Sequence, residues 1–332
     1  MTVSANTFTS RQARVNREEL SDVVDLTQRS DTPVYSMIGN KTAKSTFPEW
    51  GVESIDVPAE NAQSEGRDYE FNDVDPIERY GNHTQIFEKN GKYSNTQQKV
   101  DNAGNAEKRN AEKVRKGLAL RTDVEFSIVG NNASLGGDTR KSGSLTTWAE
   151  TNVARGAGGV NGGFNDTTKV TTAPTAATTK RAFNKGLLDN ILRQGYQSGA
   201  KLKHMYLSPY NKEIFATFMS DTNVAQFRYH PKGKGGKNVI VGDAEVYQGP
   251  LGMVYAHPNF VMGGSAEMAS NVIVLDTTKI KWAWLRPITE DTGLAKTGDF
   301  QKFVLQGEGT LCPMNERAIG VIADVFGISA TE

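Results

Sequence analysis

Residues 106–130, AEKRNAEKVRKGLALRTDVEFSIVG, read as one long helix whose two halves differ in character. The first half offers Lys, Arg, Glu and Asn around two alanines, whereas the second half carries large apolar residues from Leu118 to Ile128. With a start near Lys99, the helix would be about 45 Å long at ~1.5 Å per residue, which is the width of a whole domain. A helix that is apolar over half its length needs a core for that half only.

The polar half of this helix admits two interpretations. A solvated face held by i,i+4 ion pairs is the commoner meaning of a run of charges such as that around Arg109 and Arg115. The run follows directly on a long segment that lacks a core of its own, however. The two together favour a surface that contacts neighbouring chains.

That preceding segment, residues 41–98, holds few large side chains and many charges. STFPEW (45–50), RDYEFNDV (67–74) and RYGNHTQIFEKNGKYS (79–94) alternate as strands do, and the stretch between the first two is rich in Gly, Pro, Asn and Ser. The pattern predicts a long two-stranded excursion. Because an isolated hairpin is marginal in water, it needs a partner surface; the alternative is a flexible surface insertion.

Charge and cysteine content exclude several classes of protein. The 332 residues include 38 Lys or Arg and 38 Asp or Glu, so no basic excess indicates a nucleic-acid reader. A single cysteine, Cys312, allows no internal disulfide and fits a reducing compartment. No apolar run approaches the ~18 residues of a membrane span, and no signal peptide precedes the polar start. We therefore expect a soluble, intracellular product.

The remaining segments predict an arm and a second domain. Residues 1–40 form an N-terminal arm, with a short helix after Ser21 that ends before Pro33. Residues 99–179 contain the long helix and then a Gly-rich and Thr/Ala-rich stretch typical of a flexible connection. Two amphipathic helices and several short strands over 180–300 favour an α+β domain. Residues 301–332 alternate like two strands that pair back toward the first domain.

The sequence contains no motif that indicates catalysis. HPKGKGGKNV (230–239) lacks the spacing of a phosphate-binding loop, and no serine lies in G-x-S-x-G. The four histidines are far apart in the chain, and one cysteine cannot build a zinc site. Asp73 and Asp75 have a metal-like spacing but no further ligands, which indicates a turn. We predict no catalytic residue, no cofactor and no metal site, although residues distant in sequence can still form a site.

Several long strings resemble one known family, the major capsid proteins of tailed phages, whose shell fold is the Hong Kong ninety-seven type. They are LSDVVDLTQRSDTPVYSMIG (20–39), the pair Glu49 and Trp50, YGNHTQIFEKNGKYSNTQQKVDNAGN (80–105) and NERAIGVI (315–322). The resemblance spans most of residues 20–325. It also matches the order of arm, hairpin, long helix, Gly-rich connection and α+β domain.

The resemblance implies an α+β fold with named parts. Residues 41–98 would be the extended E-loop, 99–130 the spine helix of the peripheral (P) domain, about 180–300 the axial (A) domain, and the terminal strands a return to the P domain. In this family the E-loop lies over an adjacent subunit, and the A domain lies at the centre of a hexamer or pentamer. Lys234 and its neighbours would lie on an A-domain loop that faces the capsomer axis. Candidate residues for contacts between subunits are Trp50, Arg67, Tyr69, Phe71, Arg109, Arg115, Lys232 and Lys237.

The same resemblance implies a structural role in an icosahedral head that encloses double-stranded DNA. The partners would be other copies of the chain, a separate scaffolding protein, portal and decoration proteins, and packaged DNA contacted without sequence specificity, but no membrane. The protein would assemble in the host cytoplasm and reside in the virion capsid. Two other classes stay open: a decoration or host-surface binding protein, and a cytoplasmic enzyme with an unrecognised site.

Overall fold

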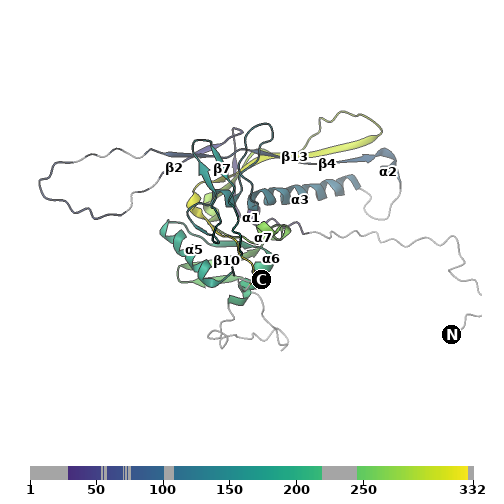
Figure 1. Cartoon of the computed structure of the whole chain (residues 1–332). Coiled ribbons are helices and arrows are strands. Elements are labelled where there is room, and N and C mark those ends of the chain that lie inside the picture. The colour runs from purple at the N-terminus through teal and green to yellow at the C-terminus, as the bar shows by residue number, and fades with distance from the viewer. Residues whose placement is uncertain are drawn as a thin grey trace, which may run out of the picture.

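The computed structural model of the chain describes residues 29–53, 55, 58–69, 71, 73, 76–100, 108–218 and 245–327. Two β-sheets organise these residues, and an elongated blade and a long excursion extend from the body on opposite sides (Figure 1). The first sheet has the order β1-β12-β13-β4 and the second the order β5-β14-β11-β8-β10-β9. Across the described residues, no helix is long and apolar enough to cross a membrane.

The blade consists of the four-stranded sheet with one long helix along it. β4 (Gln85–Ser94) pairs antiparallel with β13 (Phe300–Pro313), which also pairs antiparallel with β12 (Ile280–Glu290). β1 (Gly39–Thr42) completes the sheet in parallel with β12. The helix α3 (Lys108–Val129) runs beside β4 and β13 (Figure 1).

One face of the apolar half of α3 is buried, as the sequence predicts, although Phe126 in the same half is 48% exposed. Leu120, Val124 and Ile128 are spaced four residues apart, so they share one face of the helix, and each is fully buried. In the polar half, Val114 is 64% exposed. The predicted start near Lys99 is wrong, because Lys99 ends a separate short helix, α2 (Asn95–Lys99), after which Val100 is extended.

The excursion differs from the predicted hairpin in its strands. Among its described residues, only β2 (Glu49–Val52) and β3 (Glu78–Gly81) pair with each other, and they form its root. β4 belongs to the blade instead. The string predicted as a strand around Tyr69 and Phe71 has no strand at its described residues, since no second strand lies beside it to accept its hydrogen bonds.

The stretch predicted as a flexible connection is instead packed against the body. It contains α4 (Leu145–Trp148), β5 (Val153–Ala154), β6 (Gly163–Asn165) and β7 (Val170–Thr172), and all four residues of α4 are buried. Glycine is required at position 162, because a Cβ there would lie 2.8 Å from two backbone carbonyl oxygens of α4. The glycines therefore allow close packing rather than mobility.

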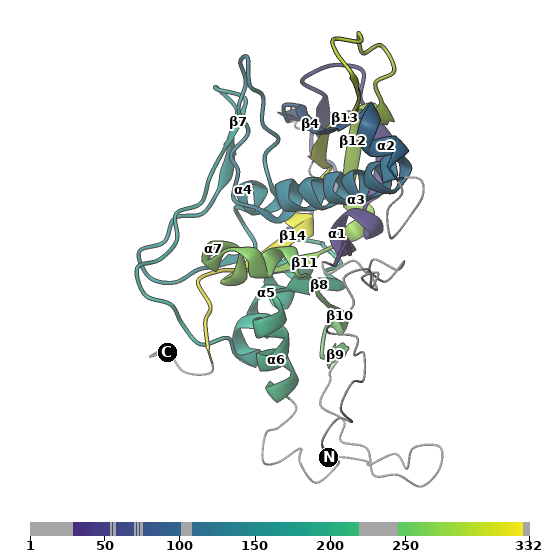
Figure 2. The same ribbon diagram turned by 90° about the vertical axis from the view of Figure 1, so that its right-hand side faces the viewer.

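The six-stranded sheet lies between two apolar cores. In β11 (Val272–Leu275), Val272 and Val274 face one core while Ile273 and Leu275 face the other, as the two-residue period of a buried strand requires. The core that contains Ile273 and Leu275 adjoins α3 and the blade, and the core that contains Val272 and Val274 adjoins α5 and α6 (Figure 2). The remaining bounds are β8 (His204–Leu207), β9 (Val246–Gly249), β10 (Gly252–Pro258), β14 (Ile319–Ile322), α5 (Lys185–Gln197), α6 (Pro209–Thr217) and α7 (Ala266–Ala269).

Two predicted boundaries need correction. β12 lies within the predicted 180–300 domain but joins the blade, because β13 pairs with it over most of its length. The last two strands belong to different sheets: β13 pairs in the blade, whereas β14 pairs with β11 and β5 in the six-stranded sheet.

The first described helix also differs from the prediction. Pro33 begins α1 (Pro33–Met37) rather than only ending a preceding helix, since proline suits the first turn of a helix. The helix predicted after Ser21 lies outside the described residues.

Candidate assembly surfaces

The root of the excursion is fixed by a cluster of aromatic rings. Trp148 of α4 lies 5.6 Å from Trp50 of β2 and 5.3 Å from Phe164 of β6, measured between ring centroids. Tyr80 of β3 contacts both Trp148 and Phe164. Trp50 is only 6% exposed and Trp148 only 1%. The excursion therefore leaves the body from a rigid base.

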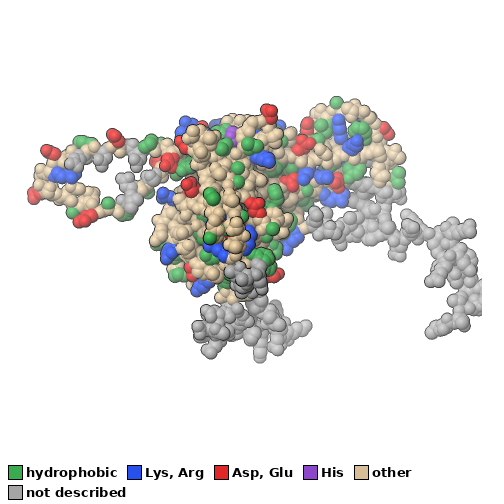
Figure 3. All heavy atoms as spheres, viewed as in Figure 1, with side chains coloured by type: hydrophobic (Ala, Val, Ile, Leu, Met, Phe, Trp, Pro, Cys, Tyr) green, Lys and Arg blue, Asp and Glu red, His purple; other side chains and the backbone are tan. Residues whose placement is uncertain are grey.

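Beyond this base, the excursion exposes large apolar side chains. Ile55, Tyr69 and Phe71 are 95%, 86% and 92% exposed, although side chains of this kind are ordinarily at least half buried. The loop extends away from the rest of the chain and carries several acidic side chains (Figure 3). Such a projecting apolar and acidic segment is suited to contact another molecule.

The polar half of α3 presents basic side chains around exposed Val114. Arg109 and Lys113 both form ion pairs with Glu290 of β12, at 3.6 and 2.7 Å. Arg115 and Lys116 both pair with Glu112, at 2.5 and 3.8 Å. Each carboxylate thus forms ion pairs with two cationic side chains, and this part of the helix keeps an excess of positive charge.

A buried carboxylate joins the first described helix to α3. Glu125 is fully buried and accepts hydrogen bonds from the backbone N–H groups of Val34 and Tyr35, at 3.0 and 2.8 Å. It also accepts one from the Asn259 side chain at 2.6 Å. Burial raises the pKa of Glu125, and the three hydrogen bonds counter part of that shift. Because the helix N-cap Thr32 makes no side-chain cap bond, Glu125 caps α1 in its place.

A second carboxylate fastens the blade next to the excursion. Glu308 of β13 accepts hydrogen bonds from Thr84, Arg140 and Arg286, at 2.7, 2.8 and 3.2 Å. Burial alone would raise its pKa, but these hydrogen bonds together hold the pKa of Glu308 below its usual value. A charged Glu308 therefore stabilises the junction between β4, β13 and the segment before α4.

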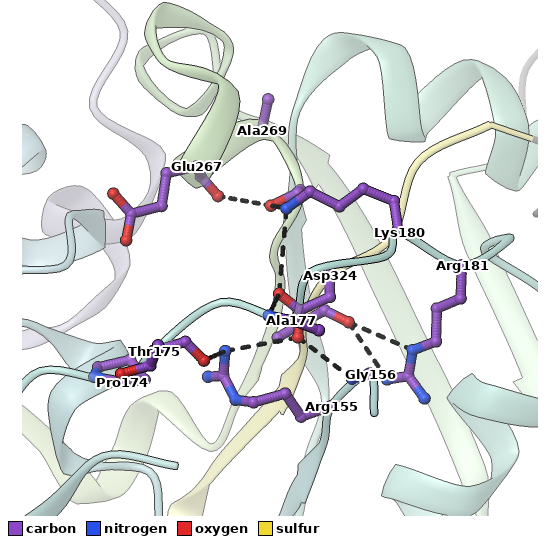
Figure 4. A network of polar contacts seen from close by, with 12 residues as sticks. Arg155, Gly156, Pro174, Thr175, Ala177, Lys180, Arg181, Glu267, Ala269 and Asp324 are labelled. Carbon is purple, nitrogen blue, oxygen red and sulfur yellow. Dashed lines mark hydrogen bonds and ion pairs between the residues drawn. The ribbon is translucent and has the colours of Figure 1, made fainter. Parts of the chain in front are cut away.

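A third carboxylate, Asp324, ties the glycine-rich segment to the chain that follows β14 (Figure 4). Its two oxygens accept the N–H groups of Gly156 and Ala177 at 3.1 and 3.0 Å. Arg155 and Lys180 lie 3.6 and 4.0 Å from the same carboxylate, which is 1% exposed. Asp324 also has a positive φ of 60°, a conformation that aspartate tolerates better than most residues. This network explains why the segment is ordered.

The structure divides the eight predicted contact residues into four groups. Arg67, Tyr69 and Phe71 are exposed on the excursion, and Arg109 and Arg115 lie on the polar half of α3. Trp50 is not on the surface, because its ring packs on Trp148. The remaining candidates, Lys232 and Lys237, and Lys234 between them, lie outside the described residues. The sequence analysis missed Glu125, Glu308 and Asp324, whose partners are far away in the chain.

The described residues offer little for catalysis. They contain no group of three or more His, Cys, Asp or Glu side chains that could hold a metal ion. Cys312 is fully buried, and burial raises its pKa to about 12, which leaves the thiol unreactive. One open cavity of about 360 Å³ lies between the end of α5 and the turn from β9 to β10, lined mainly by aliphatic side chains and two lysines, Lys201 and Lys203.

Comparison with known sequences identifies a matching family and a curated relative. The family model described as SU10 major capsid protein matches residues 2–326 of this chain. A curated relative, the major capsid protein of Escherichia phage Phieco32, is 23% identical, and the match covers 96% of this chain and 97% of the relative.

Solved structures agree with this result. A structure from Mycobacterium phage Adephagia superposes with a TM-score of 0.60 at 13% identity, covering 98% of this chain and 100% of the other. The capsid asymmetric unit of Cyanophage A-1(L) gives 0.59 at 11% identity, covering 96% and 98%. These likenesses confirm the predicted α+β fold of the Hong Kong ninety-seven type.

Proposed function

Since the chain belongs to the family of SU10 major capsid proteins, we propose that its excursion and the polar half of α3 are the two sides of one contact between neighbouring subunits. The protein is a phage major capsid protein, and copies of it form the icosahedral shell of the virion. The excursion would be the E-loop, the blade with α3 the P domain, and the six-stranded sheet with α5 and α6 the A domain.

The distribution of charge along the chain carries this proposal. Between residues 53 and 77 there are eight Asp or Glu and one Arg, a formal charge of −7, although the whole chain has 38 charges of each sign. The first fourteen residues of α3, 108–121, contain six Lys or Arg and one Glu. The excursion and the helix thus have opposite charge, and both expose apolar side chains. Complementary potentials of this kind select and orient a partner surface.

Geometry supports a contact between copies rather than within one. The excursion and the blade extend from opposite sides of the body (Figure 1), so the excursion of one chain is directed away from its own α3. A contact that joins two different surfaces of identical chains is heterologous, and repeated by rotation it closes a ring. Hexamers and pentamers would be such rings.

Charge reversal tests the contact. The double variant E65K/D68K on the excursion, or R115E/K116E on α3, should impair assembly, because like charges would then face each other. The combination of all four changes should restore part of it, since opposite charges would face each other again. Assembly is measured by sedimentation velocity and negative-stain microscopy.

A matched control changes the same amount of charge elsewhere. Asp138 and Asp166 are exposed on the body, so D138K/D166K should assemble like the unchanged protein. If the four-residue combination assembles no better than either double variant, the excursion does not contact α3. The capsid role itself would then still stand, because it rests on the family.

We further propose that the protein has a structural rather than a catalytic role and encloses double-stranded DNA without reading its sequence. Assembly would take place in the host cytoplasm with a separate scaffolding protein, and portal and decoration proteins would join the shell. Expression of the chain alone and together with a candidate scaffold tests the first of these partners. Closed shells of uniform size should form only with the scaffold, and uniform shells from the chain alone would contradict its requirement.

A further inference from the structure

Four rings from two parallel strands lie in a row on one face of the six-stranded sheet. β8 and β10 pair so that Tyr255 lies beside His204, and His257 beside Tyr206. Because side chains alternate between the faces of a strand, all four point to the same side. The centroid distances are 5.7 Å from Tyr255 to His204, 5.4 Å from His204 to His257, and 5.4 Å from His257 to Tyr206.

This column begins at the surface and ends in the core. Tyr255 is 41% exposed, both imidazoles are half-buried, and Tyr206 is fully buried. The Tyr206 hydroxyl donates to the sulfur of Met37 in α1 at 3.0 Å. Tyrosine rings on both sides therefore restrict the two imidazoles to a single arrangement, while one edge of the pair stays accessible from solvent.

The two imidazoles bring one nitrogen each to a common point. Nδ1 of His204 lies 3.2 Å from Nε2 of His257. Zinc binds imidazole nitrogen at ~2.0–2.1 Å in a tetrahedral arrangement, so two histidine ligands on one ion lie about 3.3 Å apart. The existing separation thus matches the ligand spacing of a metal ion as well as that of an N–H···N hydrogen bond.

The contact joins Nδ1 of His204 to Nε2 of His257, so each ring has a second nitrogen that can carry its proton. A neutral imidazole can carry its proton on the outer nitrogen and direct the inner lone pair toward a metal.

We propose that His204 and His257 form a two-histidine binding site for a divalent transition-metal ion of the zinc type, which would link β8 to β10. Within the described residues no third protein ligand lies close to the pair, so water completes the coordination. Rigid strands position both ligands, which lowers the entropic cost of binding. A bound ion would stabilise the sheet by mass action.

Titration of the purified full-length chain with zinc chloride in a calorimeter tests the site. We expect one ion per chain, and a rise in unfolding temperature with zinc concentration. H204F and H257F keep an aromatic ring at that place in the row but remove a ligand, so each should weaken zinc binding at least tenfold. H83F is the matched control: the His83 ring lies tilted against Phe47, 4.6 Å between centroids, and His83 is far from the pair in the chain, so its loss should leave binding unchanged.

A labelling experiment covers the case in which a variant fails to fold. In the unchanged protein, zinc should protect His204 and His257 from diethylpyrocarbonate, as read by mass spectrometry, and leave the labelling of His83 unaltered. Equal zinc affinity in H257F and the unchanged chain, or equal labelling with and without zinc, would overturn the proposal. In that case the 3.2 Å contact is a hydrogen bond and nothing more.

Discussion

Replacement of Asp324 by asparagine tests whether a single buried carboxylate holds the glycine-rich segment in place. D324N keeps the size of the side chain, and asparagine also tolerates the positive φ at this position. What it removes is the charge and one of two acceptor oxygens. Arg155, whose side chain is only 8% exposed, would lose its ion-pair partner.

The expected cost follows from those two losses. Breaking a buried ion pair by removing one partner costs ~3–5 kcal/mol. The Arg155 contact at 3.6 Å and the Lys180 contact at 4.0 Å are both long, so the lower end of that range applies. The amide of asparagine can accept from Gly156 or from Ala177 but not from both, and a buried donor without a partner costs ~1–3 kcal/mol. We expect a total of about 4 kcal/mol.

Denaturant unfolding of the unassembled subunit measures this cost, and D166N provides the matched control. Asp166 lies in the same segment and pairs with Lys169, but its side chain is 82% exposed. An exposed pair of this kind contributes ~0–1 kcal/mol. Hydrogen exchange should also accelerate at the amides of Gly156 and Ala177 in D324N and stay unchanged in D166N.

The double variant D324N/R155M separates charge from packing. Removing both partners leaves no unpaired buried charge at Arg155, so the double variant should be less destabilised than the sum of the two single variants by ~1–3 kcal/mol. If D324N shifts the free energy of unfolding no more than D166N does, the network is not what orders the segment. Strict additivity of D324N and R155M would refute the electrostatic part of the reasoning.

Three further predictions concern single buried side chains. W148A should lose ~3–5 kcal/mol of stability and assemble poorly, with W148F affected less, because Trp148 is 1% exposed beneath the root of the excursion; thermal unfolding and sedimentation measure both effects. The pKa of Glu308 lies below its usual 4.5, so the stability this carboxylate contributes is present above that pH and is lost as the pH falls through the lowered value. E308Q should therefore be destabilised at neutral pH yet lose less stability on acidification, measured as unfolding midpoints from pH 3 to 7. Cys312, with its pKa raised to about 12, should react with Ellman's reagent at pH 8 only after unfolding, and a reactive thiol in the folded chain would contradict its burial.

Local signals were sufficient for α5, for α6 and for the apolar part of α3, and for several strands. The spacing of apolar residues identified α5 between 182 and 199, and Asn184 caps it by accepting the N–H of Leu187. The boundary between the two sheets was not predictable in this way. β12 and β13 look like neighbouring strands of any meander, and their membership in the blade depends on pairing with β4, about 200 residues earlier in the chain.

At the glycine-rich stretch, amino-acid composition led to the wrong prediction of a flexible connection, and the reason is physical. Glycine is typical of flexible linkers, but it is equally needed where two backbones approach closely, as Gly162 does at α4. Sequence alone does not separate these cases, because the neighbouring backbone comes from tertiary structure. The polar anchors Glu125, Glu308 and Asp324 were missed for a related reason, since each accepts donors more than 80 residues away in the chain.

The net charge of zero conceals the uneven charge distribution on which the proposed contact depends. Summed over the chain, 38 positive and 38 negative charges exclude a basic nucleic-acid reader. The sum does not reveal that residues 53–77 carry a formal charge of −7. A contact that joins two different surfaces of identical chains requires both surfaces on every copy. An acidic excursion in such a chain must then be balanced by basic residues elsewhere, or the assembled copies would repel one another. Neutral composition together with an uneven distribution of charge therefore suits the proposed heterologous contact, and the distribution rather than the total is the property to read from the sequence.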